Sequence, residues 1–222
     1  MGPNRSVIVQ LFEWRLDDIA AECENVLGPL GYGGVQVSPI GEHMIIDEGE
    51  GKIRQPWYQR YQCVSYKLGS RSGSYDQLVD MVKRCNKAGV RVYIDMVINH
   101  MTADSKGIGS VGSEYDGYER NYPGVPFNKS HFNTKEKCGS IDGGIHDFDD
   151  HWESRNCELV GLHDLDQSQQ YVRSKQADYF NSLIKLGVAG FRIDASKHMY
   201  PQTIKQVIIN LLLTWKNSKT WL

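Results

Sequence analysis

Gly190-Phe191-Arg192-Ile193-Asp194-Ala195-Ser196-Lys197-His198 sets one carboxylate between two cations at the point where a short apolar run ends. The run Val188 to Ile193 has the length and composition of a buried parallel strand, and the charged residues fall at or just past its end. Barrel and open-sheet α/β folds place their active sites at such strand ends. An isolated Arg-x-Asp is about as often an ion pair that only caps a strand, so other segments must decide between the two.

Apolar runs alternate with segments of helical spacing along most of the chain. We expect strands at Val7–Phe12, Gly34–Ser38, Val90–Val97 and Val188–Ile193, and helices at Leu16–Leu27, Tyr75–Ala88, Ser168–Leu186 and Ile204–Trp215. This alternation indicates β/α units around a parallel sheet. Met101 to Leu165 breaks the alternation: it is rich in Gly, Asn, Asp, Ser and aromatic residues and too long for an ordinary loop. We therefore expect an irregular inserted subdomain there.

Composition bounds the classes of function. With 222 residues, 40% of them hydrophobic, the chain can bury a core as one large domain with an insertion. A formal charge of −2 provides no basic stripe for nucleic acid, and no apolar run reaches the roughly 18 residues that cross a bilayer. No signal peptide is expected, because the run Val7 to Phe12 follows Met1 almost at once.

A second strand end carries the same polar signature. Tyr93-Ile94-Asp95-Met96-Val97-Ile98-Asn99-His100 again ends an apolar run with polar side chains, so Asp95, Asn99 and His100 should lie near the rim of the sheet. The simpler interpretation is a strand followed by an Asn-His turn. Two strand ends of this kind weaken that interpretation, because stability alone requires no imidazole or carboxylate at the rim.

Taken with four further motifs, these strand ends resemble the alpha-amylase family of glycoside hydrolases, most closely its animal type. The further motifs are Gln10-Leu11-Phe12-Glu13-Trp14, Gln36-Val37-Ser38-Pro39, Gln55-Pro56-Trp57-Tyr58-Gln59-Arg60-Tyr61-Gln62 and Gly161-Leu162-His163-Asp164-Leu165. They occur in order between Ser6 and about Pro201, which makes chance agreement negligible. The resemblance implies a (β/α)8 TIM barrel, of which this chain holds the first four β/α units. Residues 1–100 would form strands 1 to 3, 101–165 a calcium-linked insertion, and 166–222 the truncated continuation with strand 4.

The resemblance also implies endohydrolysis of alpha-1,4-glucosidic bonds in starch and glycogen by a retaining mechanism. Asp194 matches the nucleophile, and Arg192 would keep it ionised. The family's general acid is a Glu at the end of the fifth strand, and a further Asp follows the seventh. Neither falls within these 222 residues, so we expect a fragment that is inactive alone.

Further residues match family positions in the glucan cleft. Trp57 and Tyr58 would stack on glucose rings, although core packing is the alternative for both. Relatives often carry Trp at the position of Tyr58. The other matching positions are Tyr61, Gln62, Asp95, His100, Leu159, Leu162, Lys197 and His198.

The resemblance implies two ions. Asn99, Asp164 and the carbonyls of Arg155 and His198 match an all-oxygen calcium site, which suits a hard cation. A solvated loop carboxylate is the alternative for Asp164 alone. Arg192 matches a chloride ligand of animal relatives, whose other chloride ligands lie beyond residue 222.

Five cysteines without a CxxC spacing leave either two disulfides and one thiol or five thiols. The resemblance pairs Cys23 with Cys85 and Cys138 with Cys157, leaves Cys63 free, and implies secretion of a protein that is monomeric at full length. Gly69 stands where vertebrate members carry a Cys of a further bridge.

Three other functions stay open on the sequence. A catalytically silent glucan-binding form would keep the aromatic residues without the acid. A transglycosylase would use the same carboxylates with a sugar as acceptor. An ancillary subunit of a membrane transporter fits less well, because no segment spans a bilayer and Asp194 is intact.

Overall fold

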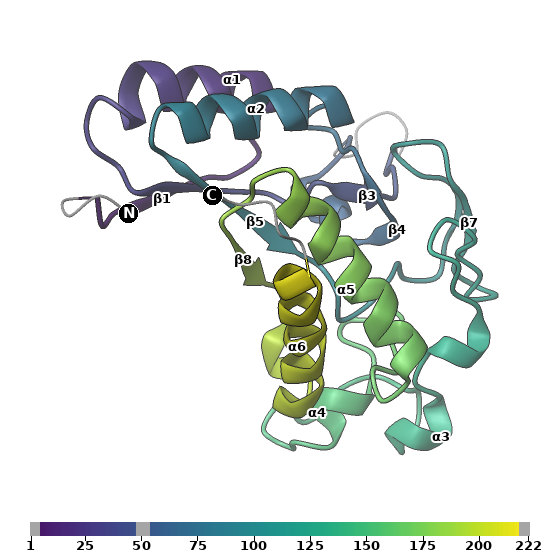
Figure 1. Cartoon of the computed structure of the whole chain (residues 1–222). Coiled ribbons are helices and arrows are strands. Elements are labelled where there is room, and N and C mark those ends of the chain that lie inside the picture. The colour runs from purple at the N-terminus through teal and green to yellow at the C-terminus, as the bar shows by residue number, and fades with distance from the viewer. Residues whose placement is uncertain (1–4, 48–53, 218–222) are drawn as a thin grey trace.

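The computed structural model describes residues 5–47 and 54–217. The predicted strands form one four-stranded parallel sheet in the order β1-β2-β5-β8 (Figure 1). Their bounds are β1 Ile8–Leu11, β2 Gly34–Val37, β5 Arg91–Met96 and β8 Gly190–Ile193. Each lies inside the apolar run that predicted it, so the parallel β/α arrangement is confirmed. The last five residues of the expected 166–222 segment lie outside the described part.

The predicted helices are also present, with one local change. α2 (Tyr75–Lys87) is preceded by the N-cap residue Ser74, whose hydroxyl forms a capping box with the Gln77 side chain. α5 spans Gln170–Lys185 and α6 spans Pro201–Asn217. α1 (Leu16–Glu22) runs on as the five-residue π-helix η1 (Cys23–Leu27) rather than as regular α-helix. In Figure 1, α1 lies beside α2 and α5 beside α6, so the helices cover the sheet in pairs.

The main core lies between this sheet and the helices. Val35, Val92 and Ile94 on the central strands are fully buried, as is Met81 of α2. Cys23 and Cys85 form a disulfide inside this core, here called the barrel disulfide. It ties η1 to α2 next to the sheet.

A two-stranded antiparallel hairpin follows the second strand and was not predicted. It pairs β3 (Gly41–His43) with β4 (Cys63–Leu68), and the 3-10 helix η2 (Trp57–Tyr61) precedes β4. β3 is buried although two of its three residues are Glu42 and His43. The Glu42 carboxylate accepts hydrogen bonds from the backbone N–H groups of Val111 (3.0 Å) and Ser113 (2.8 Å) in the insertion.

The insertion is irregular, as predicted. It contains the short pair β6 (Lys106–Ile108) and β7 (Glu114–Asp116), the 3-10 helix η3 (Lys129–His131), and the four-residue helices α3 (Lys135–Cys138) and α4 (Glu153–Asn156). A second core of buried aromatic side chains holds it together, among them Tyr122, Phe127 and Phe132. Cys138 and Cys157 form the insertion disulfide. Both predicted pairings are confirmed, and Cys63 is the free, buried cysteine.

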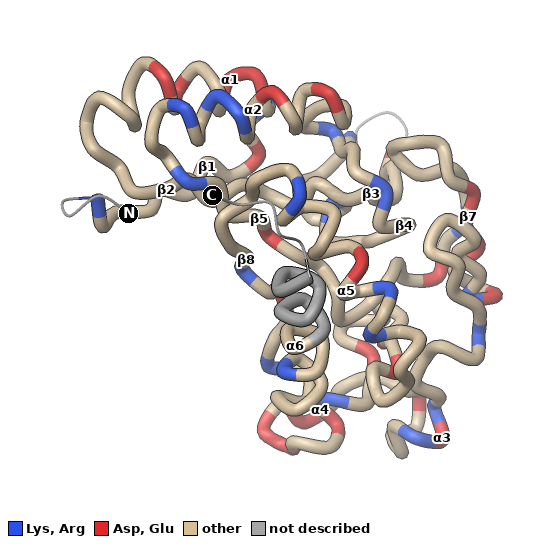
Figure 2. Tube along the Cα trace, in the orientation of Figure 1, with Lys and Arg blue, Asp and Glu red and all other residues tan. Residues whose placement is uncertain are grey.

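Charged positions of both signs are interspersed along the described chain (Figure 2). None of the helices in the described residues has the length and apolar character needed to cross a bilayer.

Candidate active site

The carboxyl ends of β5 and β8 bring the two predicted polar clusters together. Asp95 and Arg192 are partners in the parallel register of these strands. Nη1 of Arg192 lies 2.8 Å from both carboxylate oxygens of Asp95 and 2.6 Å from Oδ1 of Asp194. The backbone N–H of Asp194 donates to the carbonyl of Met96 at 2.9 Å. The next residue, Ala195, has a φ of 50°, a left-handed conformation that turns the chain directly after the carboxylate. The predicted contact between Arg192 and Asp194 is therefore present.

Asp95 is buried behind the Arg192–Asp194 pair and does not reach the surface of the site. Only 1% of Asp95 is exposed, and its Oδ2 accepts a hydrogen bond of 2.8 Å from the Tyr61 hydroxyl. Burial raises the pKa of Asp95, against the opposing effect of the hydrogen bonds from Arg192 and Tyr61. Burial, together with the Asp95 charge, raises the pKa of Tyr61. In this structure Asp95 supports Arg192 and Tyr61, whereas the sequence predicted a substrate contact.

A cleft of about 500 Å³ opens above the Arg192–Asp194 pair. Its walls come from η2, from the end of β5, from the insertion and from the end of β8. The lining residues are Trp57, Tyr58, Tyr61, Gln62, His100, Ala103, Leu159, Val160, Leu162, Arg192 and Asp194. All of these except Ala103 and Val160 were predicted from the sequence.

Trp57 and Tyr58 present aromatic rings at the cleft. Trp57 is 54% exposed and Tyr58 45%, so the alternative of core packing is wrong for both residues. The Trp57 ring meets those of Tyr58, Tyr61 and Phe12 edge-on, with centroids 5.8 to 5.9 Å apart. Such an exposed aromatic surface suits the apolar face of a sugar ring.

His100 forms part of the cleft wall as a buried imidazole. Its Nε2 lies 2.9 Å from the carbonyl oxygen of Tyr61. A carbonyl can only accept, so Nε2 carries the proton in this contact. Burial lowers the pKa of His100, which favours the neutral ring.

Lys197 and His198 do not line the cleft but contact the insertion. The Lys197 ammonium lies over the ring of Phe148 at 6.0 Å, and the His198 ring meets the same phenyl ring edge-on at 6.1 Å. Phe148 is 45% exposed and was missed, because a single aromatic residue in an aperiodic segment gives no signal. The likewise unpredicted Val160 is 79% exposed and adopts a φ of 49°, which is unusual for a β-branched residue. Of these residues, only Val160 lines the cleft.

The four predicted calcium ligands lie on segments that meet where the insertion joins the sheet. The Leu165 N–H donates to the carbonyl of Asn99 at 3.0 Å, and His198 Nδ1 bonds the carbonyl of Ser154, next to Arg155, at 2.8 Å. Asp164 is buried, and burial raises its pKa well above the ordinary range. Within the described residues no three His, Cys, Asp or Glu side chains cluster around a possible metal position. A cation here would therefore depend on amide and carbonyl oxygens beside the single carboxylate, and the buried Asp164 fits that donor set.

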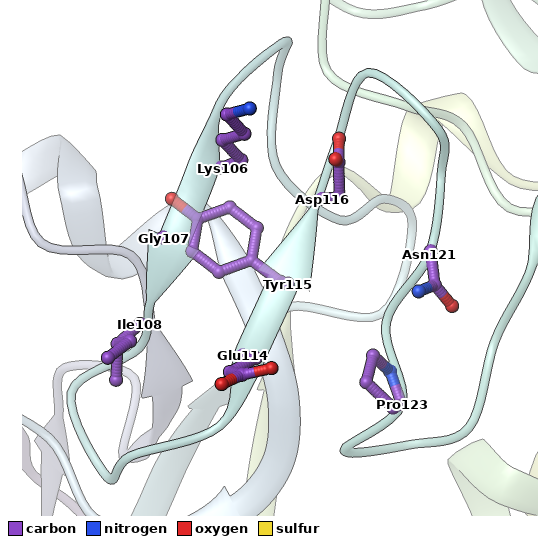
Figure 3. A pocket seen from close by; sticks show the side chains of 8 residues that line it. All are labelled: Lys106, Gly107, Ile108, Glu114, Tyr115, Asp116, Asn121 and Pro123. Carbon is purple, nitrogen blue, oxygen red and sulfur yellow. The ribbon is translucent and has the colours of Figure 1, made fainter.

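A separate hollow of about 560 Å³ lies against the β6–β7 pair (Figure 3). Lys106, Glu114, Tyr115, Asp116 and Asn121 are among its lining residues. None of the predicted site residues lies in it, so the cleft beside Asp194 is the candidate active site.

The sheet carries a carboxylate–guanidinium pair and an aromatic cleft at its carboxyl edge, which is where α/β barrels place their active sites. Residues 27–211 match the family described as "Alpha amylase, catalytic domain". The chain belongs to the alpha-amylase family and resembles its animal members.

The relatives agree with this assignment. The chain is 54% identical to an alpha-amylase of Dermatophagoides pteronyssinus over 94% of its own length, and 50% identical to the pancreatic alpha-amylase of Sus scrofa, also over 94%. These matches cover 41% and 40% of the relatives, so the chain spans about two fifths of their length.

Solved structures show the same relationship. Alpha-amylase I of Eisenia fetida superposes with a TM-score of 0.90 at 48% identity, covering 94% of this chain and 41% of that one. A variant of the same enzyme, solved as a complex with maltohexaose, gives identical values. A cyclomaltodextrin glucanotransferase at 21% identity and a TM-score of 0.73 shares the fold.

Proposed function

We propose that this chain supplies the nucleophile and one wall of the cleft of an endo-acting alpha-amylase that cleaves alpha-1,4-glucosidic bonds in starch and glycogen. The observation that carries the proposal is the Asp194 carboxylate, held 2.6 Å from Arg192 Nη1 at the edge of an aromatic-lined cleft. The maltohexaose complex of the 48% identical Eisenia fetida enzyme supports an alpha-glucan as ligand.

In the proposed reaction, an oxygen of Asp194 attacks the anomeric carbon and forms a covalent glycosyl ester while the bond to the leaving glucose oxygen breaks. Arg192 favours the charged carboxylate that this attack requires. The leaving oxygen must take a proton from an acid, and the acid that the family resemblance implies is not among these 222 residues. We therefore expect the chain alone to bind a glucan without cleaving it.

We further propose two ions for the complete protein. Calcium would be held by Asn99, Asp164 and the carbonyls of Arg155 and His198, and would fix the insertion to the ends of β5 and β8. Chloride would bind Arg192, whose hydrogen bonds to the carboxylates of Asp95 and Asp194 are donated by Nη1. The two disulfides support an oxidising, extracellular location, and we propose a monomer at full length.

Activity is best tested in a completed catalytic domain. The described chain would be fused to the remaining segment of the Eisenia fetida enzyme, and release of reducing sugar from starch would be measured. Asp194→Asn should lower kcat by at least about a thousandfold, because a neutral amide cannot form the ester. Asp80→Asn, which changes an exposed carboxylate on α2, serves as the matched control and should leave kcat unchanged.

The outcomes separate the open alternatives. Full activity of Asp194→Asn would refute the proposed nucleophile. An inactive fusion that still binds maltohexaose would favour the silent glucan-binding form. Oligosaccharides longer than maltohexaose, formed alongside the shorter fragments that the donor releases, would favour a transglycosylase.

A further inference from the structure

The 3-10 helix η2 inverts the usual distribution of side chains between surface and interior. Its aromatic residues Trp57 and Tyr58 are about half exposed, whereas the polar Gln59 and Arg60 are each only 1% exposed. Charged groups are rarely buried completely, and large aromatic side chains usually bury most of their surface. The polar face of η2 is therefore its attachment to the protein, and its aromatic face is left free at the cleft.

Arg60 makes this attachment through three directed contacts. Its Nη1 donates to Glu13 Oε1 at 2.8 Å, and its Nη2 donates to the hydroxyls of Ser70 (2.9 Å) and Ser72 (2.8 Å). Burial lowers the pKa of Arg60, and the hydrogen bond and charge of Glu13 oppose this effect. Taking charged groups out of water is costly, so the presence of this ion pair is not by itself evidence that it stabilises the fold.

Glu13 connects the end of β1 to both ends of the aromatic segment. It adopts a left-handed φ of 67°, and its N–H donates to the Ser38 hydroxyl at 2.8 Å. Its second oxygen lies 3.4 Å from Arg71 Nη1, and Arg71 also donates to the carbonyl of Gln55. The Glu13 carboxylate thus contacts Arg71, which holds Gln55 two residues before η2, and Arg60, which lies near the end of η2.

We propose that Glu13 and Arg60 are positioning residues that hold the Trp57–Tyr58 surface in the orientation that stacks on the glucan. Among the described residues, Glu13 and Arg60 do not line the cleft and do not contact Asp194. Any effect of this pair on the glucan must therefore act through η2. Its loss should weaken glucan binding without changing the chemical step. This inference rests on the proposed function for its ligand, while the geometry it assigns is independent of any ligand.

The first test measures the position of Trp57 without ligand. The test uses Glu13→Gln, which keeps the side-chain shape and removes the charge that pairs with Arg60 and Arg71. The Trp57 indole N–H resonance in a ¹⁵N spectrum of the 222-residue chain is assigned by its loss in Trp57→Phe. We expect one sharp peak in the wild type and a broadened or split peak in Glu13→Gln. Glu24→Gln, which disrupts an exposed pair with Arg84, should leave the peak unchanged. An unaltered peak in Glu13→Gln would overturn the proposal.

The second test is a double-mutant cycle in which calorimetry measures the affinity of each variant for maltohexaose. Glu13→Gln should raise the Kd about three- to tenfold in the wild-type background and have no further effect in Trp57→Ala, because both changes act on the same surface. Equal losses in both backgrounds would mean that Glu13 only stabilises the fold, and would refute positioning. If the wild type does not bind maltohexaose, the proposed function fails, and the indole resonance still decides whether the pair positions Trp57.

Discussion

Replacing Trp57 by Ala should weaken maltohexaose binding by a calculable amount. The residue is 54% exposed, which for a Trp side chain of about 250 Å² leaves about 135 Å² open to solvent. A stacked glucose ring covers roughly half of that surface. At about 25 cal/mol per Å², the lost burial is about 1.7 kcal/mol, or roughly a 15- to 20-fold higher Kd. Isothermal titration of the 222-residue chain with maltohexaose measures this change.

Trp152 provides a matched control within the same chain. It is also 54% exposed, but it lies outside the cleft, and its indole N–H donates to the carbonyls of Lys137 and Cys138. Trp152→Ala should change the Kd less than about twofold. Equal losses in the two variants, or no loss in Trp57→Ala, would show that the cleft beside Asp194 is not where the glucan stacks.

Three further predictions concern stability. Burial lowers the pKa of His43 to about 4, so the contribution of the neutral ring to stability is complete above pH 6.5. The free energy of unfolding should fall by about 1.4 kcal/mol per pH unit as the pH drops from 6.5 toward 4. In His43→Gln, the free energies of urea unfolding at pH 7 and pH 5 should differ less than they do in the wild type. The barrel disulfide joins residues 62 apart, and the insertion disulfide joins residues 19 apart. Replacing the cysteines by Ala should lower the free energy of unfolding by about 4 kcal/mol for the barrel disulfide and about 3 kcal/mol for the insertion disulfide. A larger loss for the insertion disulfide in urea unfolding would contradict this loop-entropy argument. A calcium chelator should lower the Tm of the wild type but not of Asp164→Asn, as scanning calorimetry would show; an equal drop in both would place calcium elsewhere.

The sheet and its main helices could be predicted because their signals are local. Val90 to Val97 is a mostly apolar run, and the Ser74 cap and Gly89 mark the two ends of α2. β3 was missed because its Glu42 and His43 look like surface residues. The buried Glu42 carboxylate is satisfied by backbone N–H groups of the insertion about 70 residues away, and a local pattern cannot report such partners.

The candidate site likewise contains residues that the sequence could predict and residues that it could not. Strand ends and the family motifs predicted Asp194, Arg192 and most of the cleft lining, and the structure brings these residues together. Sequence could not show that Asp95 lies behind Arg192, because that depends on the register between β5 and β8. Phe148 and Val160 come from the aperiodic insertion, whose path is set by tertiary contacts.

Gly69 lies against the side chain of Val111. A Cβ atom built at this position would approach Cγ2 of Val111 to 2.8 Å, and the backbone there has a φ of 153°. A single change to Cys at 69 would therefore meet a steric clash and gain a thiol without a partner. A side chain at position 69 would therefore require Val111 to be replaced or displaced first, which constrains the order in which these two positions can change.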